Sequence, residues 1–322
     1  MNRRDFLAAA ATVPLGLTAE RPAIAGTRGG TPLALVTADL ESQVVVYDLA
    51  SARIVRRIET PPGPKSIETV GDGALALVAH TAAGVISLID VSTLRVRHVL
   101  RGFQTPRYTA AVPDGDTALV TDAGTGELVT IDLFGGRVAR RLAVGLHARH
   151  LSLDAMTMTA WVALGFSAPT IAVIDLSAPG GPRLAGRIAP PFPAHDVVFA
   201  PGGSRAWVSS GDERRLAVYD AETRRVLFTL PAGEPPQHIA FARGGAYVTS
   251  DDAVRVHRLR DGKLLRTTPV PAGSYNVTQG WERVLTPSLE RGTLAVLDER
   301  GRLLARPVLA RAAHDACFVA GS

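Results

Sequence analysis

Two residue types are almost missing from this sequence: cysteine and lysine. The single cysteine, Cys317, excludes an intrachain disulfide and any metal site built from several cysteines. Lysine occurs only as Lys65 and Lys263, so arginine carries nearly all of the basic charge behind the net charge of +5. These arginines form no basic run, and aromatic residues make up only 5 % of the chain. The composition therefore argues against a nucleic-acid partner, which requires clustered basic and stacking aromatic side chains.

The sequence also has no hydrophobic run long enough to anchor it in a membrane. Its longest apolar stretch, from Leu7 to about Thr18, is too short and too weakly apolar to span a bilayer. Over the whole chain 46 % of residues are hydrophobic and 20 % are charged, which excludes the disordered class. The 31 glycines and 22 prolines predict many turns.

The first 25 residues have the layout of an export signal. The stretch "RRDFL" (residues 3–7) precedes the apolar run, and a small-x-small site follows at residues 23–25. This stretch resembles the twin-arginine signal, which pairs two arginines with a following Phe-Leu. The resemblance implies that residues 1–25 are a signal peptide and that residues 26–322 work in the periplasm. A chain without disulfides suits a route that exports folded proteins.

After this segment one phrase recurs, a β-rich run that ends in an aspartate. Its period of about 42 residues is that of a four-stranded propeller blade. Turns such as "GDG" and "PGG" precede each phrase and supply the positive φ angles that tight hairpins need. The repeats predict an all-β, seven-bladed β-propeller that forms a single domain over residues 26–322. Arg258 replaces the aspartate in the sixth repeat, and the other six positions are Asp48, Asp90, Asp132, Asp175, Asp220 and Asp298.

The repeat resembles the YVTN family of β-propeller proteins. That family's consensus runs Tyr-Val-Thr-Asn, a turn, Val-x-Val-Ile-Asp, a turn, then Ile-x-Val-Gly. "ALVTDAGTGELVTIDLFGGRVARRLAVG" (118–145) and "AYVTSDD" (246–252) are close copies, and the resemblance covers residues 32–320. It implies the propeller fold but no particular activity, because the consensus is structural. Proteins of this type often accompany periplasmic redox systems.

A repeated hexapeptide predicts how the ring closes. "AHDVVF" (194–199) begins the innermost strand of a complete repeat, and "AHDACF" (313–318) occurs near the end of the chain. The first repeat lacks its innermost strand. We therefore expect the C-terminal segment to complete the first blade, which leaves no open sheet edge. Cys317 lies in this strand and is interpreted as a small core residue.

Two polar positions start every innermost strand, where the strands reach the mouth of the central channel. Half of the chain's eight histidines fall at these positions. In blade order the pairs are Lys65-Ser66, Arg107-Tyr108, Arg149-His150, His195-Asp196, Gln237-His238, Tyr275-Asn276 and His314-Asp315. The candidate ligand-binding residues are Lys65, Arg107, Arg149, His150, His195, Asp196, His238, His314 and Asp315.

Four interpretations of this ring remain open. Its polar groups line a water-filled channel mouth, or its basic groups bind an anionic ligand. Its histidines could instead hold a transition metal or a haem-type cofactor, with His195, His238 and His314 as the metal-ligand candidates. The fourth interpretation is acid–base catalysis by a His-Asp pair. The sequence identifies no cofactor.

The sequence predicts a periplasmic, monomeric and non-catalytic propeller. Its channel mouth would bind a small anionic ligand, a cofactor or a periplasmic partner protein, as an accessory to a redox or catabolic system. The alternative is a propeller enzyme, either a lyase or a lactonase-like hydrolase, or a haem- or metal-handling protein that uses the histidine ring.

Overall fold

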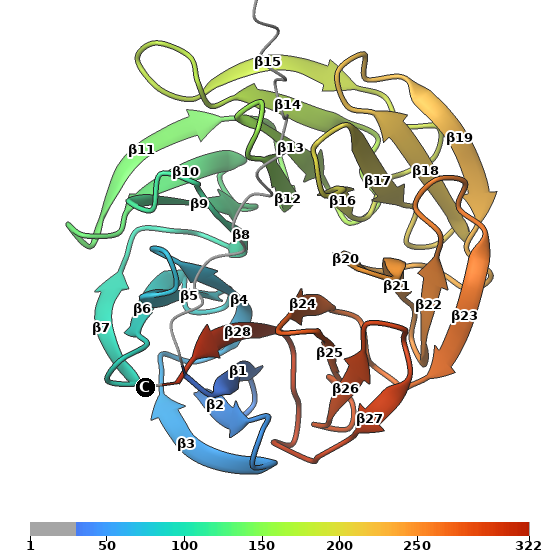
Figure 1. The fold of residues 1–322 in the computed structure, drawn as a ribbon. Helices are drawn as coiled ribbons and strands as arrows, with labels where there is room; N and C mark the ends of the chain where they lie inside the picture. The colour runs from blue at the N-terminus through green and yellow to red at the C-terminus, as the bar shows by residue number, and fades with distance from the viewer. Residues whose placement is uncertain (1–29, 322) are drawn as a thin grey trace, which may run out of the picture.

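The computed structural model describes residues 30–321, which form strands, turns and loops. The strands build seven four-stranded antiparallel sheets, arranged as blades around a central channel (Figure 1). The predicted seven-bladed propeller is therefore confirmed. The signal peptide expected over residues 1–25 lies outside the described residues. Within the described part of the chain no helix could cross a membrane.

Each blade contributes one strand to each of four concentric layers. The innermost strands are β28 (Ala316–Ala320), β4 (Pro64–Val70), β8 (Pro106–Ala111), β12 (Ala148–Asp154), β16 (Val197–Phe199), β20 (Ile239–Ala242) and β24 (Thr278–Gly280). The second strands are β1 (Pro32–Ala38), β5 (Leu75–His80), β9 (Thr117–Asp122), β13 (Thr159–Leu164), β17 (Arg205–Ser209), β21 (Gly245–Thr249) and β25 (Arg283–Pro287).

The two outer layers follow the same order around the ring. The third strands are β2 (Gln43–Asp48), β6 (Val85–Asp90), β10 (Glu127–Asp132), β14 (Ile171–Asp175), β18 (Arg215–Asp220), β22 (Ala253–His257) and β26 (Leu294–Asp298). The outermost strands are β3 (Arg53–Glu59), β7 (Arg95–Leu100), β11 (Arg137–Ala143), β15 (Arg183–Ile188), β19 (Val226–Pro231), β23 (Leu264–Pro269) and β27 (Leu303–Ala305).

The hydrophobic core lies between blades, because each blade packs its two faces against its two neighbours. All six residues of β5 are buried, whereas outermost β3 is exposed at every position except Ile58. Leu35 and Val46 of the first blade pack with Val78 and Ile89 of the second. Full burial of an aliphatic side chain of this size contributes about 1.5–3 kcal/mol. Burial of these side chains between blades therefore stabilises the ring.

Two tryptophans occupy the tyrosine position of the repeat and are completely buried. Trp161 packs edge-on against Phe199 and Tyr219 of the next blade, at ring-centroid distances of 5.2 and 5.6 Å. Trp207 packs against Phe241 in the same way, at 6.2 Å. Both tryptophans therefore serve as packing residues between neighbouring blades.

The recurring aspartate caps the turn between the third and the outermost strand. Asp48 Oδ1, for example, accepts the backbone N–H groups of Ala50 and Ser51 at 2.8 and 3.1 Å. An aspartate side chain stabilises such a turn by replacing a backbone acceptor. In the sixth repeat Arg258 holds this position, and the carboxylate comes from Asp261, which accepts the N–H of Lys263.

The C-terminal strand completes the first blade, as predicted. In Figure 1, red β28 lies beside blue β1, and the two strands pair antiparallel with Leu35 opposite Cys317. The backbone N–H of Thr37 also donates to the carbonyl of Asp315 at 2.9 Å. Cys317 is buried in the core of this blade, and its burial raises the pKa of the thiol. The cysteine is therefore the core residue that the sequence indicated.

Candidate functional site

Hydroxyl side chains of the second strands fix the backbone of the channel-mouth residues. In each case the Ser or Thr hydroxyl donates to a carbonyl at, or two to three residues before, the start of the next blade's innermost strand. The bonds join Thr37 Oγ1 to Lys65 O (2.8 Å), Thr121 Oγ1 to Arg149 O (2.7 Å), Ser209 Oγ to Gln237 O (2.6 Å) and Thr249 Oγ1 to Tyr275 O. The threonine of the repeat thus positions the mouth residues of the neighbouring blade.

The two His-Asp pairs use their carboxylates in the same way, to join blades. Asp196 accepts the N–H of Val197 at 2.9 Å and that of Ile239, in the next blade, at 3.0 Å. Because both oxygens bond to the backbone and neither carboxylate lines the mouth pocket, the expected ligand-binding role does not fit Asp196 and Asp315. Asp315 makes the equivalent bonds, from Asp315 Oδ1 to Ala316 N (2.9 Å) and from Asp315 Oδ2 to Ile67 N (3.1 Å).

The channel mouth opens into a pocket of ≈ 380 Å³. Six of the nine residues proposed from the sequence line it: Lys65, Arg107, Arg149, His195, His238 and His314. The other lining residues are Tyr108, Phe166, Gln237, Tyr275, Asn276 and Leu289. Its volume falls within the range of small-molecule sites, and its lining combines charged, polar and aromatic groups.

Three residues around the mouth were not identified from the sequence. Phe166 and Leu289 reach the pocket from loops between second and third strands. Asp39, in the corresponding loop of the first blade, binds Lys65 Nζ at 3.1 Å and lies 3.9 Å from His314 Nδ1. These loops differ in length and sequence between repeats, so no repeated pattern marked the three residues.

Arg107 and Arg149 are the unbalanced charges of the pocket. Lys65 has Asp39 as its counter-ion, but neither arginine forms an ion pair with any residue between 30 and 321. Burial, together with the positive charge of Arg149, lowers the pKa of Arg107. The guanidinium of Arg149 lies 5.3 Å from the centre of the Phe166 ring, and its Nε is buried without a hydrogen-bond partner.

The histidines add little positive charge to the mouth. Burial, with smaller contributions from neighbouring positive groups, lowers the pKa of His195 to about 4 and that of His314 to about 3. Burial also holds the pKa of His150 well below its ordinary value. These three side chains are therefore neutral near pH 7. Of the basic groups that the sequence placed at the mouth, the arginine pair therefore carries the net positive charge, because Asp39 neutralises Lys65 and burial keeps most of the histidines neutral.

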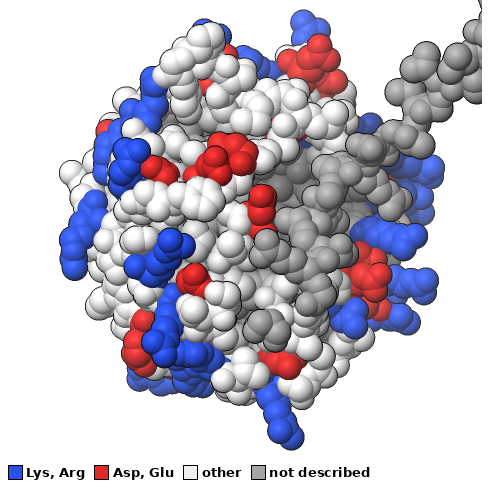
Figure 2. Space-filling model, turned by 60° about the vertical axis from the view of Figure 1, so that its left-hand side comes forward, with Lys and Arg blue, Asp and Glu red and all other residues white. Residues whose placement is uncertain are grey.

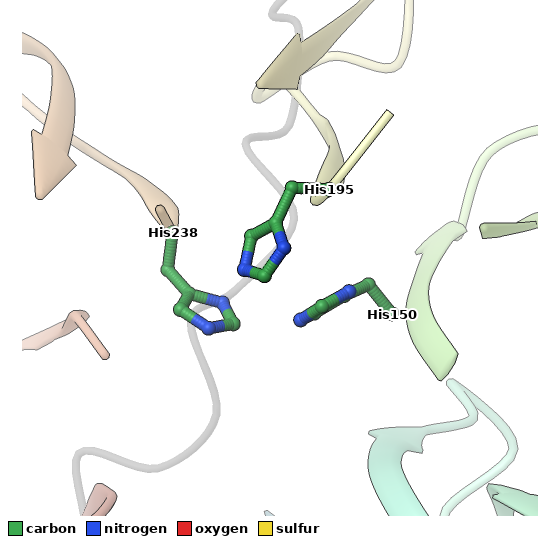
Figure 3. A group of neighbouring side chains, drawn as sticks. All are labelled: His150, His195 and His238. Carbon is green, nitrogen blue, oxygen red and sulfur yellow. The ribbon is translucent and has the colours of Figure 1, made fainter. Parts of the chain in front are cut away.

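Three histidines from neighbouring blades converge at one point of the mouth (Figure 3). One ring nitrogen from each of His150, His195 and His238 lies within 4.8 Å of the other two. The centroid of the His150 ring is 4.4 Å from that of His195 and 4.8 Å from that of His238. His150 is 1 % exposed and also stacks on Tyr108, at a centroid distance of 4.1 Å.

This trio differs from the one expected from the sequence, which grouped His195 and His238 with His314. The blades that begin with β12, β16 and β20 are consecutive, so His150 lies beside the other two histidines. The blade of β24 separates His314 from them. His314 instead lies near Asp39.

On the described part of the face drawn in Figure 2, Lys and Arg side chains do not gather into one continuous patch. They are interspersed there with Asp and Glu side chains. The described part of this face therefore presents no extended positive surface of the kind that binds a nucleic-acid backbone.

No protein-family model matches this chain, and no curated protein sequence matches it. Solved structures do resemble it. Hydrazine synthase of Kuenenia stuttgartiensis is 15 % identical, with a TM-score of 0.71 over 80 % of this chain and 89 % of that one. A functionally unknown protein from Desulfotomaculum acetoxidans is 12 % identical, with a TM-score of 0.76 over 90 % and 99 %. At these identities the likeness establishes the fold alone.

The dihydro-heme d1 dehydrogenase NirN, in complex with DHE, is a third similar structure. It is 17 % identical to this chain, with a TM-score of 0.66 over 86 % of this chain. The match spans 63 % of the NirN chain, so the comparison concerns part of that protein.

Proposed function

We propose that this chain is a non-catalytic β-propeller that binds a small anionic ligand at its channel mouth. The observation that carries the proposal is the pair Arg107 and Arg149, which lines the pocket without an acidic partner among the described residues. Two like charges held together in a partly desolvated site repel each other. A carboxylate or phosphate placed between them would remove this repulsion and accept charge-assisted hydrogen bonds.

The rest of the pocket favours an organic anion over a bare inorganic one. Phe166, Tyr108 and Leu289 provide apolar surface, and Gln237 provides a hydrogen-bonding amide. Pockets of about 300–1,000 Å³ suit organic ligands of this kind. The ligand class is therefore a small organic anion, either a carboxylate or a phosphate ester, whose carbon skeleton contacts these side chains.

We further propose that the protein acts in the periplasm as a monomeric accessory of a redox or catabolic system. The stretch "RRDFL" (residues 3–7) and the YVTN-like repeats support this setting. A periplasmic partner protein that presents an acidic group could dock on the same mouth. The similar fold in a hydrazine synthase structure and in the dehydrogenase NirN is compatible with this assignment.

A second candidate function uses the histidines rather than the arginines. His238 Nδ1 lies 3.6 Å from Asp196 Oδ2, and His195 lines the pocket beside it. This arrangement would suit a lyase or a lactonase-like hydrolase with His238 as base, or a haem-handling protein with His195 as axial ligand. NirN, whose structure contains DHE, gives the haem alternative its support. An absorption spectrum of the protein isolated from its native source tests it, since bound haem gives an intense Soret band.

Thermal-shift measurements with a panel of anions test the main proposal. The panel is phosphate, succinate, citrate and glycerol 3-phosphate at low ionic strength, because exposed charge interactions weaken as salt rises. Binding to the folded state raises the midpoint of unfolding. We expect at least one anion to raise it in the natural chain and to lose this effect in Arg149→Gln. Arg53→Gln, on exposed strand β3, removes the same charge away from the pocket and should retain the shift. A panel without any shift would contradict the proposal.

A further inference from the structure

We propose that His150, His195 and His238 bind one divalent ion of the late first transition series, such as Zn²⁺ or Cu²⁺, next to the anion pocket. The three side chains come from three consecutive blades, and Figure 3 shows their rings turned toward a common point. One nitrogen of each ring lies within 4.8 Å of the other two. Nitrogen ligands of a tetrahedral zinc ion lie about 3.3 Å apart, given Zn–N bonds of about 2.0–2.1 Å. Small rotations about the side-chain bonds would bring the nitrogens to this spacing.

His150 is the strongest indication that a ligand belongs at this point. Its ring is 1 % exposed, and both ring nitrogens are buried without a hydrogen-bond partner. Buried polar atoms in folded proteins are nearly always bonded, because an unpaired one costs about 1–3 kcal/mol. A metal ion would bond to one ring nitrogen of His150. Because a metal–nitrogen bond is stronger than a hydrogen bond, it would also offset the cost of leaving the second ring nitrogen without a partner.

The other two histidines are held with a free nitrogen for the ion. His195 Nδ1 lies 3.0 Å from the carbonyl oxygen of Phe166, so Nδ1–H donates and Nε2 keeps its lone pair. His238 Nδ1 faces Asp196 Oδ2 at 3.6 Å, and the backbone bonds of Asp196 fix this carboxylate. Metal-binding histidines commonly donate their second N–H to a carbonyl or carboxylate in this way, which orients the ring.

The donor set selects the class of metal. Neutral imidazoles suit Zn²⁺, Cu²⁺ and Ni²⁺, whereas Mg²⁺ and Ca²⁺ require several oxygen ligands. Three protein ligands also leave a coordination position open for water or a small anion. Since His195 and His238 both line the pocket, this position would face the pocket.

Positive charge near the cluster opposes a cation and couples the two sites. Arg149 lines the same pocket as His195 and His238 and directly precedes His150 in the chain. An anion bound to Arg107 and Arg149 would neutralise this charge, so anion and metal should each strengthen binding of the other. This coupling rests on the anion-binding function proposed above, whereas the metal site does not.

Titration of the full chain with Co²⁺ and Zn²⁺, in a chloride buffer without organic anions, tests the metal site. Four-coordinate cobalt bound by three histidines gives d–d bands that are much stronger, and lie at longer wavelength, than the weak visible absorption of cobalt in water. We expect one equivalent of Co²⁺ to produce these bands and one equivalent of Zn²⁺ to remove them. His150→Ala and His238→Gln should each weaken Zn²⁺ binding by about 100-fold or more, since even supporting residues of metal sites change affinity by about 10–100-fold.

His147→Asn is the matched control, because His147 is exposed, lies outside the trio and has a positive φ that asparagine tolerates. It should bind metal like the natural chain. Thermal melting without metal checks that each variant folds, and His238→Gln keeps the test valid if His150→Ala does not fold. Two results would overturn the metal site: no one-to-one metal binding by the natural chain, or equal Zn²⁺ affinity in both histidine variants and the natural chain. Anion binding that depends on Arg149 would remain intact in that case, so the two proposals fail separately.

Discussion

Asp196 and Asp315 make equivalent hydrogen bonds in two different blades. Each carboxylate accepts the N–H of the following residue and the N–H of an isoleucine in the next blade, Ile239 for Asp196 and Ile67 for Asp315. The Asp315 bonds tie the C-terminal strand to the second blade, across the closure of the ring. The aspartate of each His-Asp sequence therefore joins two blades, which explains why the sequence occurs twice. The histidine of each pair lines the channel mouth.

Replacement of Asp315 by asparagine should destabilise the propeller. An amide presents an NH₂ group to one of the two backbone N–H donors, which leaves a buried donor unpaired. We expect a loss of about 1–3 kcal/mol in the free energy of unfolding, measured by urea denaturation. Asp252→Asn, at an exposed loop position, should leave stability within about 0.5 kcal/mol of the natural chain. Equal stability of the two variants would show that the Asp315 bonds contribute nothing.

Thr37→Val tests the hydroxyl that joins the same blades. Thr37 Oγ1 donates to Lys65 O at 2.8 Å and accepts the N–H of Asp315 at 2.9 Å. Valine has nearly the same shape as threonine but no hydroxyl, so the carbonyl of Lys65 and the N–H of Asp315 both lose this hydrogen-bond partner. The expected cost is about 1–3 kcal/mol, read from the urea midpoint at unchanged slope. Thr159→Val, whose hydroxyl makes one long exposed contact, serves as the comparison. A loss in both variants alike would point to β-strand effects of valine instead.

Glu68 should make the stability depend on pH. It lies on innermost strand β4, near the carboxyl of Asp315 and the thiol of Cys317. Burial, and then the charge of Asp315, raises the pKa of Glu68 from 4.5 to about 8. Between these pH values the folded chain keeps a proton that the unfolded chain releases. The free energy of unfolding must therefore fall as pH rises through this window.

The variant Glu68→Gln isolates this effect. The slope cannot exceed about 1.4 kcal/mol per pH unit, and it is smaller here because the Glu68 side chain is only partly buried. Burial raises the pKa of Asp315 from 3.8 to about 6, so Asp315 adds a dependence of the same sign, but only below about pH 6, in both proteins. The natural chain should lose stability relative to the variant from pH 5 to pH 8. Parallel stability curves for the two proteins would contradict the assignment.

The fold was predictable because its determinants are local and repeated. An aspartate at the end of each third strand caps a turn, and apolar residues mark strands packed on both faces. The match between residues 194–199 and 313–318 located the closing strand, since equivalent strands need equivalent bonds. In the sixth repeat the capping function moved from position 258 to Asp261, which the periodicity could not anticipate.

The site was less predictable because its properties depend on contacts between blades. The sequence identified the mouth positions, but not that Asp39 neutralises Lys65 or that backbone N–H groups occupy Asp196. It also treated the histidines as basic, although burial keeps most of them neutral. Phe166 lies in a loop without repeat character, so no pattern marked it.

Calorimetric titration with citrate at low ionic strength tests the central claim most directly, that Arg107 and Arg149 form an anion site. Citrate carries several carboxylates and fits a pocket of ≈ 380 Å³. We predict one-to-one binding that weakens about 10- to 100-fold in Arg107→Gln and in Arg149→Gln, because a hydrogen bond to a charged group contributes about 1.5–3 kcal/mol. Arg53→Gln should bind like the natural chain. Absence of binding, or equal affinity in all four proteins, would contradict the account.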